Sequence, residues 1–271
     1  MVEENKINSE LRALRTSLDE IDARLRGIII ERAGIAARIA EVKKAHNLSV
    51  FHPSREVQIL RDLSNSDLGP LNLYQIWGIW RGLINANTAI QSKLNIIIEK
   101  NIKKEHRDLI LHNFGAINNL TEEANAIESM KNERNIGSKI LIIPNDSSAL
   151  LEIDGKNLSV IGILPQIQNK SMEPSLYIIG QPDQFHREDD IYTYKIEIDK
   201  KKMIDAEHLY TFLQDNNIEH DLKFLKKLSE DFYLLSIKGK IDSGARNIPS
   251  IDGIQYIGRY APPIIIGEEF E

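Results

Sequence analysis

Apolar side chains recur at alternating steps of three and four along residues 9 to 46 of the chain. The members of this stripe are Leu11, Leu14, Leu18, Ile21, Leu25, Ile28, Ile35, Ile39 and Val42. Such spacing is typical of a heptad seam, the apolar face with which one long helix packs against another. Position 32 belongs to the series, but the sequence places Arg32 there. The pattern therefore predicts one long helix with an arginine in the middle of its apolar stripe.

Two further helices are predicted after this one. Pro53 favours the first turn of a helix through "REVQILRDLSN", which ends before the turn signal "SDLGP". We expect a third helix from about Leu71 to Lys100, whose apolar stripe is interrupted by Asn87, with Gln91 one turn beyond it. The apolar members of that stripe are Leu73, Ile76, Trp80, Leu83, Ile90 and Leu94.

The pattern changes after about residue 105 to short β-rich runs. The runs "KILIIP", "LSVIGILP" and "SLYIIGQP" alternate with shorter helical patterns, which favours an α/β segment. The last part follows the order strand, helix, strand, strand, short helix, strand, which is the βαββαβ order of ferredoxin-like folds. We therefore expect a multidomain protein of the α and α+β classes. Its parts would be a helical domain at residues 1–102, a small α/β segment at 103–187 and a βαββαβ domain at 188–271.

Composition narrows the classes of function. A length of 271 residues favours more than one domain, and the absence of cysteine excludes disulfides, thiolate zinc sites and cysteine nucleophiles. The N-terminus lacks the pattern of a signal peptide and no apolar run is long enough to span a membrane, so we expect a cytoplasmic protein without a membrane partner. A net charge of −6 gives no field that would gather nucleic acid. The seven histidines lack metal-ligand spacing, so neither a metal nor another cofactor is expected.

The cations of the first helix point to an anionic ligand. Arg32 and Lys43 are separated by only about 20° around the helix axis and by roughly 16 Å along it, a gap that two long side chains can narrow. Arg15 lies about 25 Å from Arg32, too far for one small ligand, but an antiparallel second copy would bring the two together. Because a buried guanidinium needs an anionic partner, the spacing indicates a small dicarboxylate bound between two chains.

A purely structural interpretation competes with this one. An arginine in a helix seam more often pairs with an internal glutamate, or extends its charged end into water, than it binds a substrate. Asn87 and Gln91 equally fit polar residues that set the register of a coiled seam. Residue types and spacing alone do not decide between the two interpretations.

The first hundred or so positions resemble the all-helical class of chorismate mutases. The resemblance rests on "LRALRTSLDEIDARLRGIIIERAGIAARIAEVKK", on "PSREVQIL" and on "GPLNLYQIWGIWRGLINANTAIQ". It implies an intertwined homodimer that forms an all-helical bundle with two active sites, each lined by cations from both chains. It further implies conversion of chorismate to prephenate, without a cofactor, in the biosynthesis of phenylalanine and tyrosine.

The resemblance also implies roles for individual residues. Arg15, donated by the partner chain, and Arg32 would bind the two carboxylates of chorismate, with Arg55 helping to position the charges. Lys43 and Gln91 would face the ether oxygen, and Glu56 would take the ring hydroxyl. The sequence departs from the family pattern in two places: Asn87 stands where serine is frequent, and His52 stands where an aspartate usually caps the second helix.

The remainder of the chain is similar in its order of parts to a bifunctional chorismate mutase/prephenate dehydratase that ends in an ACT domain. The "GTFS"-like strand, the Thr-Arg-Phe motif and the "ESRP" motif of those proteins do not occur here. We therefore expect a reduced remnant without dehydratase activity, followed by an ACT-like domain. The alternative is a non-catalytic dimeric regulatory or partner-binding protein, which the retained set of polar residues argues against.

Overall fold

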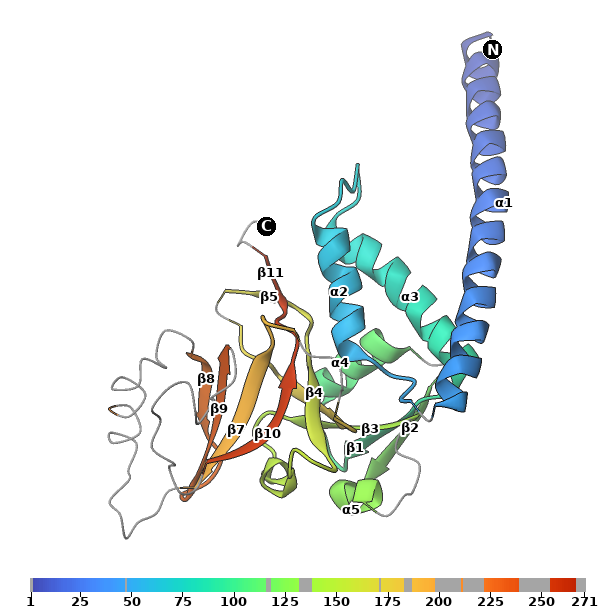
Figure 1. Cartoon of the computed structure of the whole chain (residues 1–271). Coiled ribbons are helices and arrows are strands. Elements are labelled where there is room, and N and C mark those ends of the chain that lie inside the picture. The colour runs from blue at the N-terminus through green and yellow to red at the C-terminus, as the bar shows by residue number, and fades with distance from the viewer. Residues whose placement is uncertain are drawn as a thin grey trace.

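The protein consists of three N-terminal helices set beside a large mixed sheet (Figure 1). This arrangement is taken from a computed structural model. The model describes residues 2–46, 48–115, 118–131, 138–170, 172–182, 187–197, 211, 222–238 and 254–266.

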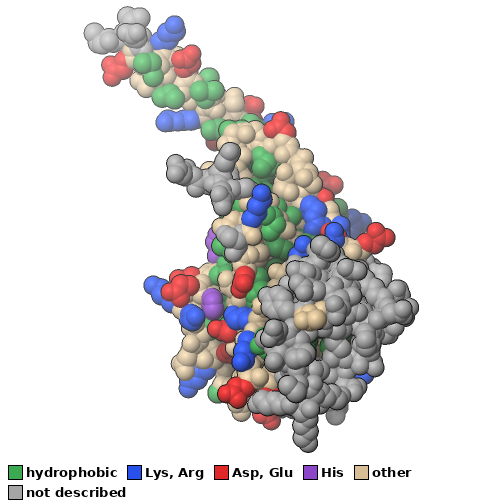
Figure 2. Space-filling model, turned by 90° about the vertical axis from the view of Figure 1, so that its left-hand side faces the viewer, with side chains coloured by type: hydrophobic (Ala, Val, Ile, Leu, Met, Phe, Trp, Pro, Cys, Tyr) green, Lys and Arg blue, Asp and Glu red, His purple; other side chains and the backbone are tan. Residues whose placement is uncertain are grey.

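Helix α1 spans Val2–Ala45, which confirms the single long helix predicted from the heptad pattern. Most of its length projects away from the rest of the molecule (Figure 1). Each of the nine apolar residues of its stripe leaves between 44% and 62% of its surface exposed, and hydrophobic side chains are visible along the projecting part in Figure 2. The apolar stripe of α1 is therefore not covered by its own chain.

Helices α2 and α3 lie beside the base of α1 (Figure 1). Helix α2 spans Pro53–Ser64, with proline in its first turn as predicted. Helix α3 spans Leu73–Gln91 and begins with a reciprocal capping box between Asn72 and Gln75. The prediction that this helix continues to Lys100 is wrong, because Asn95–Glu99 forms strand β1. Its three consecutive isoleucines are β-branched and buried on both faces of the sheet, as is typical of a central parallel strand.

The buried face of α3 differs from the apolar stripe that the sequence indicated. Within the helix, the residues of that stripe are only half-buried or exposed, whereas Trp77, Arg81, Ile84 and Asn85 are buried. The reason is that α3 lies between two neighbours. One side faces α1, where Arg32 donates a hydrogen bond to the carbonyl of Leu83, and the other faces the end of helix α4 (Lys104–Phe114).

The sheet contains nine strands in the order β2-β1-β3-β6-β4-β10-β7-β9-β8. Its first half pairs β1 in parallel with β2 and β3, while β6 runs antiparallel to both β3 and β4. The predicted runs "KILIIP", "LSVIGILP" and "SLYIIGQP" form β3, β4 and β6. The bounds in this half are β2 Asn119–Glu123, β3 Lys139–Pro144, β4 Ser159–Leu164 and β6 Leu176–Gly180.

The second half of the sheet is antiparallel and contains the four strands predicted for the C-terminal part. Strand β7 pairs with β10 and β9, and β9 pairs with β8. The two helices predicted at 206–217 and 244–250 lie, apart from Thr211, outside the described residues. The bounds are β7 Ile191–Glu197, β8 Leu222–Lys227, β9 Phe232–Lys238 and β10 Ile254–Tyr260.

The two halves meet where β10 runs parallel to β4, with Gly258 opposite Val160. Gly258 has φ 149°, and a Cβ there would lie 2.3 Å from the backbone of Val160, so the strands approach this closely only without a side chain. The sheet thus runs without interruption through both segments that the sequence assigned to residues 103–187 and 188–271. The two boundaries between the three predicted domains stay a prediction.

Alternating side chains of the sheet build a hydrophobic cluster on each face. Ile96 and Ile98 of β1 pack with α4 on one face, and Ile97 packs on the other with α5 (Ala126–Lys131). Phe51, just before α2, belongs to the α4 side. Helices α2, α3 and α4 therefore share one face of the sheet. In the described part of the chain, no helix is both long and apolar enough to cross a membrane.

Three short elements lie outside the nine-stranded sheet. A 3₁₀-helix spans Ser148–Glu152 and leads toward β4. Strands β5 (Ile167–Asn169) and β11 (Ile264–Ile266) pair in parallel as a separate two-stranded sheet. Strand β11 packs against α2, so the end of the described chain returns to the N-terminal helices.

Candidate active site

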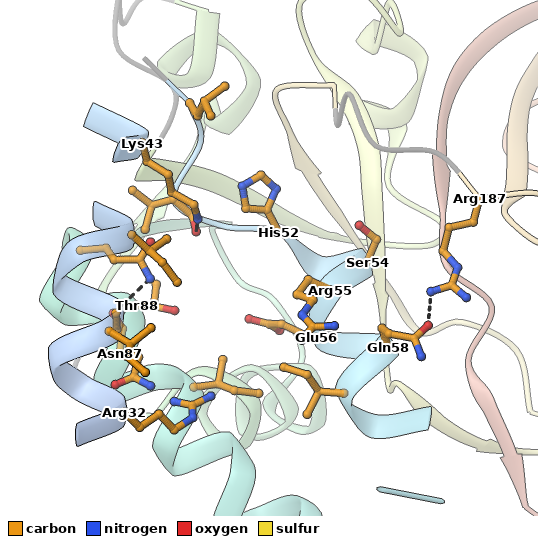
Figure 3. Close-up of a pocket in the computed structure, with 18 residues that line it drawn as sticks. Arg32, Lys43, His52, Ser54, Arg55, Glu56, Gln58, Asn87, Thr88 and Arg187 are labelled. Carbon is orange, nitrogen blue, oxygen red and sulfur yellow. Dashed lines mark hydrogen bonds between the residues drawn. The ribbon is translucent and has the colours of Figure 1, made fainter. Parts of the chain in front are cut away.

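A cavity of about 730 Å³ lies between α1, α2 and α3 (Figure 3). Its size falls within the range of small-molecule sites in proteins. Six of the seven residues predicted for the site line this one cavity. They are Arg32, Lys43, Arg55, Glu56, Asn87 and Gln91. The seventh, Arg15, is exposed on the projecting part of α1 and does not line the cavity in a single chain.

Helix α1 contributes two cations to one wall. Arg32 is half-buried and donates to the carbonyl of Leu83 at 3.5 Å, and burial lowers the pKa of its guanidinium because the charged form loses hydration. Lys43, eleven residues later, donates to the carbonyl of Val50 at 2.9 Å. Apolar side chains of the same helix, Ile35 and Ile39, line the cavity between them.

Helix α2 forms the opposite wall with Arg55 and Glu56. The two residues face Arg32 and Lys43 across the cavity (Figure 3). Arg55 is exposed, whereas Glu56 is buried and accepts from Arg81 at 2.6 Å. The carboxylate of Glu56 is thus neutralised by a buried ion pair, although it still lines the cavity.

Arg81 does not line the cavity, but it holds Glu56, and it was not predicted from the sequence. Its Nε donates to the carbonyl of Asn113 at 2.9 Å and its Nη2 to Oδ1 of Asn85 at 3.1 Å. The guanidinium also lies over the rings of Trp77, at 5.2 Å, and Phe114, at 6.0 Å. These contacts fix the arginine and, through it, Glu56. The pattern gave no signal for Arg81, because it lies outside the apolar stripe that the sequence indicated for this helix.

Helix α3 contributes polar side chains from its last turns. Asn87, Thr88 and Gln91 line the cavity, and Nε2 of Gln91 donates to the carbonyl of Asn87 at 3.4 Å. The buried Oε1 of Gln91 has no hydrogen-bond partner among the described residues. The amide of Gln91 is therefore held by one long hydrogen bond, and a ligand group could replace it at little cost.

The turn that precedes α2 is also part of the wall. His52 lines the cavity and occupies the N-cap position, but its side chain makes no capping hydrogen bond to the first turn of α2, all of which the structure describes. This agrees with the weak capping expected of histidine.

Arg187 reaches the rim of the same cavity from the segment just before β7. It donates to Oε1 of Gln58 on α2 (Figure 3). Nothing in the sequence pattern could have placed this residue, because its position depends on how the sheet packs against α2.

The balance of charges suits an anion. Four cations line the cavity, at positions 32, 43, 55 and 187, and the carboxylate of Glu56 is already paired with Arg81. Arg187 is already paired with Asp189. A ligand with two carboxylates would supply anionic partners for the guanidinium groups of Arg32 and Arg55. Within the described residues, no group of three or more histidine, aspartate or glutamate side chains could hold a metal ion.

Comparisons with known proteins find sequence relatives over the N-terminal third of the chain. The bifunctional chorismate mutase/prephenate dehydratases of Stutzerimonas stutzeri and of Aquifex aeolicus are 29% and 31% identical over 92 and 91 residues. Each match covers 32% of this chain and 25% of the relative, so the chain spans about a quarter of the length of these relatives. A prephenate dehydratase structure from Streptococcus mutans aligns with 64% of this chain and all of its own at 15% identity and a TM-score of 0.42. Residues 14–92, the stretch that builds all three helical walls of the cavity, match the chorismate mutase type II family.

Proposed function

We propose that the cavity between α1, α2 and α3 converts chorismate to prephenate. The observation that carries this proposal is the convergence of Arg32, Lys43 and Arg55 with the side-chain amides of Asn87 and Gln91 around one volume of small-molecule size. The match of residues 14–92 to chorismate mutase type II supports the same reaction. The whole protein's role in phenylalanine and tyrosine biosynthesis follows as part of this proposal.

Binding would fold the substrate into its reactive shape. Chorismate carries two carboxylates, one on its ring and one on a flexible enolpyruvyl arm. The guanidinium groups of arginines on α1 and α2 would hold both carboxylates through paired hydrogen bonds. The enolpyruvyl arm would then lie over the ring before any bond changes. Such preorganisation is worth several kcal/mol because the loss of conformational freedom occurs on binding rather than in the chemical step.

The chemical step needs no proton transfer and no cofactor. The ether bond breaks while a carbon–carbon bond forms within the same molecule, and negative charge grows on the ether oxygen in the transition state. Lys43 and Gln91 lie on adjacent walls and would donate hydrogen bonds to that oxygen. Glu56, fixed by Arg81, would accept from the ring hydroxyl with the part of its carboxylate that faces the cavity.

The site would be completed by a second copy of the chain. The nine residues of the α1 stripe are too apolar and too exposed for a helix that stays in water alone. An antiparallel copy packed along this stripe would bury it and would carry Arg15 of the partner toward Arg32. We therefore propose an intertwined homodimer with two shared sites.

The loss of chorismate absorbance on addition of the purified protein tests the activity. Formation of prephenate at a rate that saturates with chorismate is the expected result. An unchanged chorismate spectrum, with correctly folded dimeric protein, would contradict the proposal and favour the alternative of a non-catalytic dimeric regulatory module.

The C-terminal region is proposed to be ACT-like and to lack dehydratase activity. The antiparallel order β10-β7-β9-β8 supports a βαββαβ unit, because it places the first and third strands at the centre. Prephenate incubated with the protein should not yield phenylpyruvate. A change in mutase rate on adding phenylalanine or tyrosine would assign a sensing role to this region. The cytoplasmic location expected from the sequence stays a prediction.

A further inference from the structure

The second helix of the cavity rests on the C-terminal half of the chain. Pro53, the first residue of α2, packs against Gly162 of β4, where an added Cβ would lie 3.1 Å from the proline side chain. At the other end of the helix, Arg61 donates to the carbonyl of Pro262 at 3.3 Å. The wall that carries Arg55 and Glu56 is thus seated on strands that follow it by more than a hundred residues.

A short turn before β7 makes the most specific contact with α2. We call Arg187, Asp189 and Asp190 the α2 clasp. Arg187 donates from Nη1 to Oε1 of Gln58, and its Nε donates to Asp189 at 3.1 Å. Asp189 in turn pairs with Arg61 of α2 at 3.3 Å. The clasp therefore holds α2 at two positions three residues apart, on one side of the helix.

The clasp is itself anchored in the sheet. Asp190 is 2% exposed, accepts from the backbone N–H of Arg187 at 3.0 Å and pairs with Arg259 of β10 at 3.3 Å. These contacts fix the turn that presents Arg187, so the position of Gln58 is tied to β10, the strand at which the two halves of the sheet meet.

Helix α2 has particular need of such support near the cavity. The side chain of its N-cap residue, His52, makes no capping hydrogen bond. Gln58 lies one turn after Arg55 on the same side of the helix, and its amide is oriented further by donation to Asp62 at 2.5 Å. Any loosening at Gln58 would shift Arg55 and the rim of the cavity together.

We infer that Arg187 is a positioning residue for the cavity: through Gln58 it holds the α2 wall in place, so that the N-terminal site depends on the C-terminal sheet. The inference rests on the proposed mutase activity for its kinetic test. The C-terminal half would then contribute to the N-terminal site. A helical domain that worked on its own would not need this contribution.

Steady-state chorismate kinetics on the full-length protein test the inference. Arg187→Ala should lower kcat/KM by about tenfold, with KM rising more than kcat falls, because Lys43 and Gln91 lie on other helices and keep their places. Gln58→Ala should show a similar loss, and the double variant should lose no more than either single variant. Arg187→Lys should recover part of the activity. Arg107→Ala, which removes an exposed ion pair with Glu122 on α4 and β2, is the matched control and should leave kcat/KM unchanged.

An unchanged kcat/KM in Arg187→Ala, or a fully additive loss in the double variant, would overturn the inference. Hydrogen exchange of the α2 backbone gives a measurement that does not depend on activity. Amides of residues 57–64 should exchange faster in Arg187→Ala than in the wild type and in Arg107→Ala. If the wild type fails to convert chorismate, the proposed function fails, whereas unchanged exchange in α2 would defeat the positioning role by itself.

Discussion

Replacing Arg81 by leucine tests the buried ion pair that supports the cavity. The substitution removes the partner of a Glu56 carboxylate whose side chain is only 8% exposed. It also leaves Oδ1 of Asn85 without its donor and removes one of the two donors to the carbonyl of Asn113, the other being Nδ2 of Asn85. Removal of one partner from a buried pair typically costs about 3–5 kcal/mol, because the remaining charge stays buried without compensation. We expect a loss of this size in the free energy of unfolding of Arg81→Leu.

Tryptophan fluorescence during denaturant unfolding is a suitable assay. Both tryptophans of the chain, Trp77 and Trp80, lie on α3 beside Arg81, so the signal reports the affected region. Adding Glu56→Leu to Arg81→Leu removes the unpaired charge and should return the stability to within about 2 kcal/mol of the wild type. Arg107→Leu, at an exposed pair, should cost less than about 1 kcal/mol. If Arg81→Leu lowers the free energy of unfolding by less than about 1 kcal/mol, the buried ion pair does not support the fold as described.

Three other predictions concern the reaction, the dimer and the pH dependence of stability. Lys43→Ala should lower turnover by roughly 10²–10³-fold while the dimer mass measured by light scattering stays unchanged; near-normal turnover would contradict the assigned role. Leu18→Asp combined with Leu25→Asp should shift the mass measured by light scattering toward that of one chain. Thr16→Asp, on the opposite side of α1, should leave this mass unchanged. An unchanged mass in the double variant would argue against a dimer that packs along the apolar stripe of α1. Partial burial raises the pKa of Asp154, but hydrogen bonds from three backbone amides and the Asn157 side chain prevail and lower it to about 2. Asp154 therefore stabilises the fold by about 1 kcal/mol above its unfolded pKa, and this contribution is lost as the pH falls toward 2. The difference in thermal stability between the wild type and Asp154→Asn should narrow over that range, and a constant difference would contradict the pKa shift.

Local patterns in the sequence were sufficient for α1, α2, the start of α3 and most of the described strands. The heptad spacing predicted α1, and Pro53 predicted the start of α2, because both signals act within a few residues. The end of α3 was missed, since the isoleucine run at 96–98 also fits a buried helix segment when it is read without its neighbours in the sheet. The sheet order depends on long-range pairing, which no local pattern specifies.

The residues of the site also divide into those that local patterns or the family resemblance could predict and those that depend on long-range packing. Arg32 and Lys43 were found because helix geometry alone places them on one face. Arg55 and Glu56 were found through the resemblance to chorismate mutases, which also placed Asn87 and Gln91. Arg81 was missed because it lies outside the apolar stripe that the sequence indicated for α3. Arg187 could not be predicted because it reaches the cavity only through the packing of the C-terminal sheet against α2.

A mixture of two inactive variants, Arg15→Ala and Lys43→Ala, tests whether two chains share each site. Arg15→Ala and Lys43→Ala should each have little activity as homodimers, because every site lacks one essential cation. After unfolding and refolding together, heterodimers would hold one site with both substitutions and one with neither, so about a quarter of all sites should be native. Chorismate turnover should therefore recover to about a quarter of the wild-type value. No recovery, in a mixture shown by tagged subunits to contain heterodimers, would contradict it.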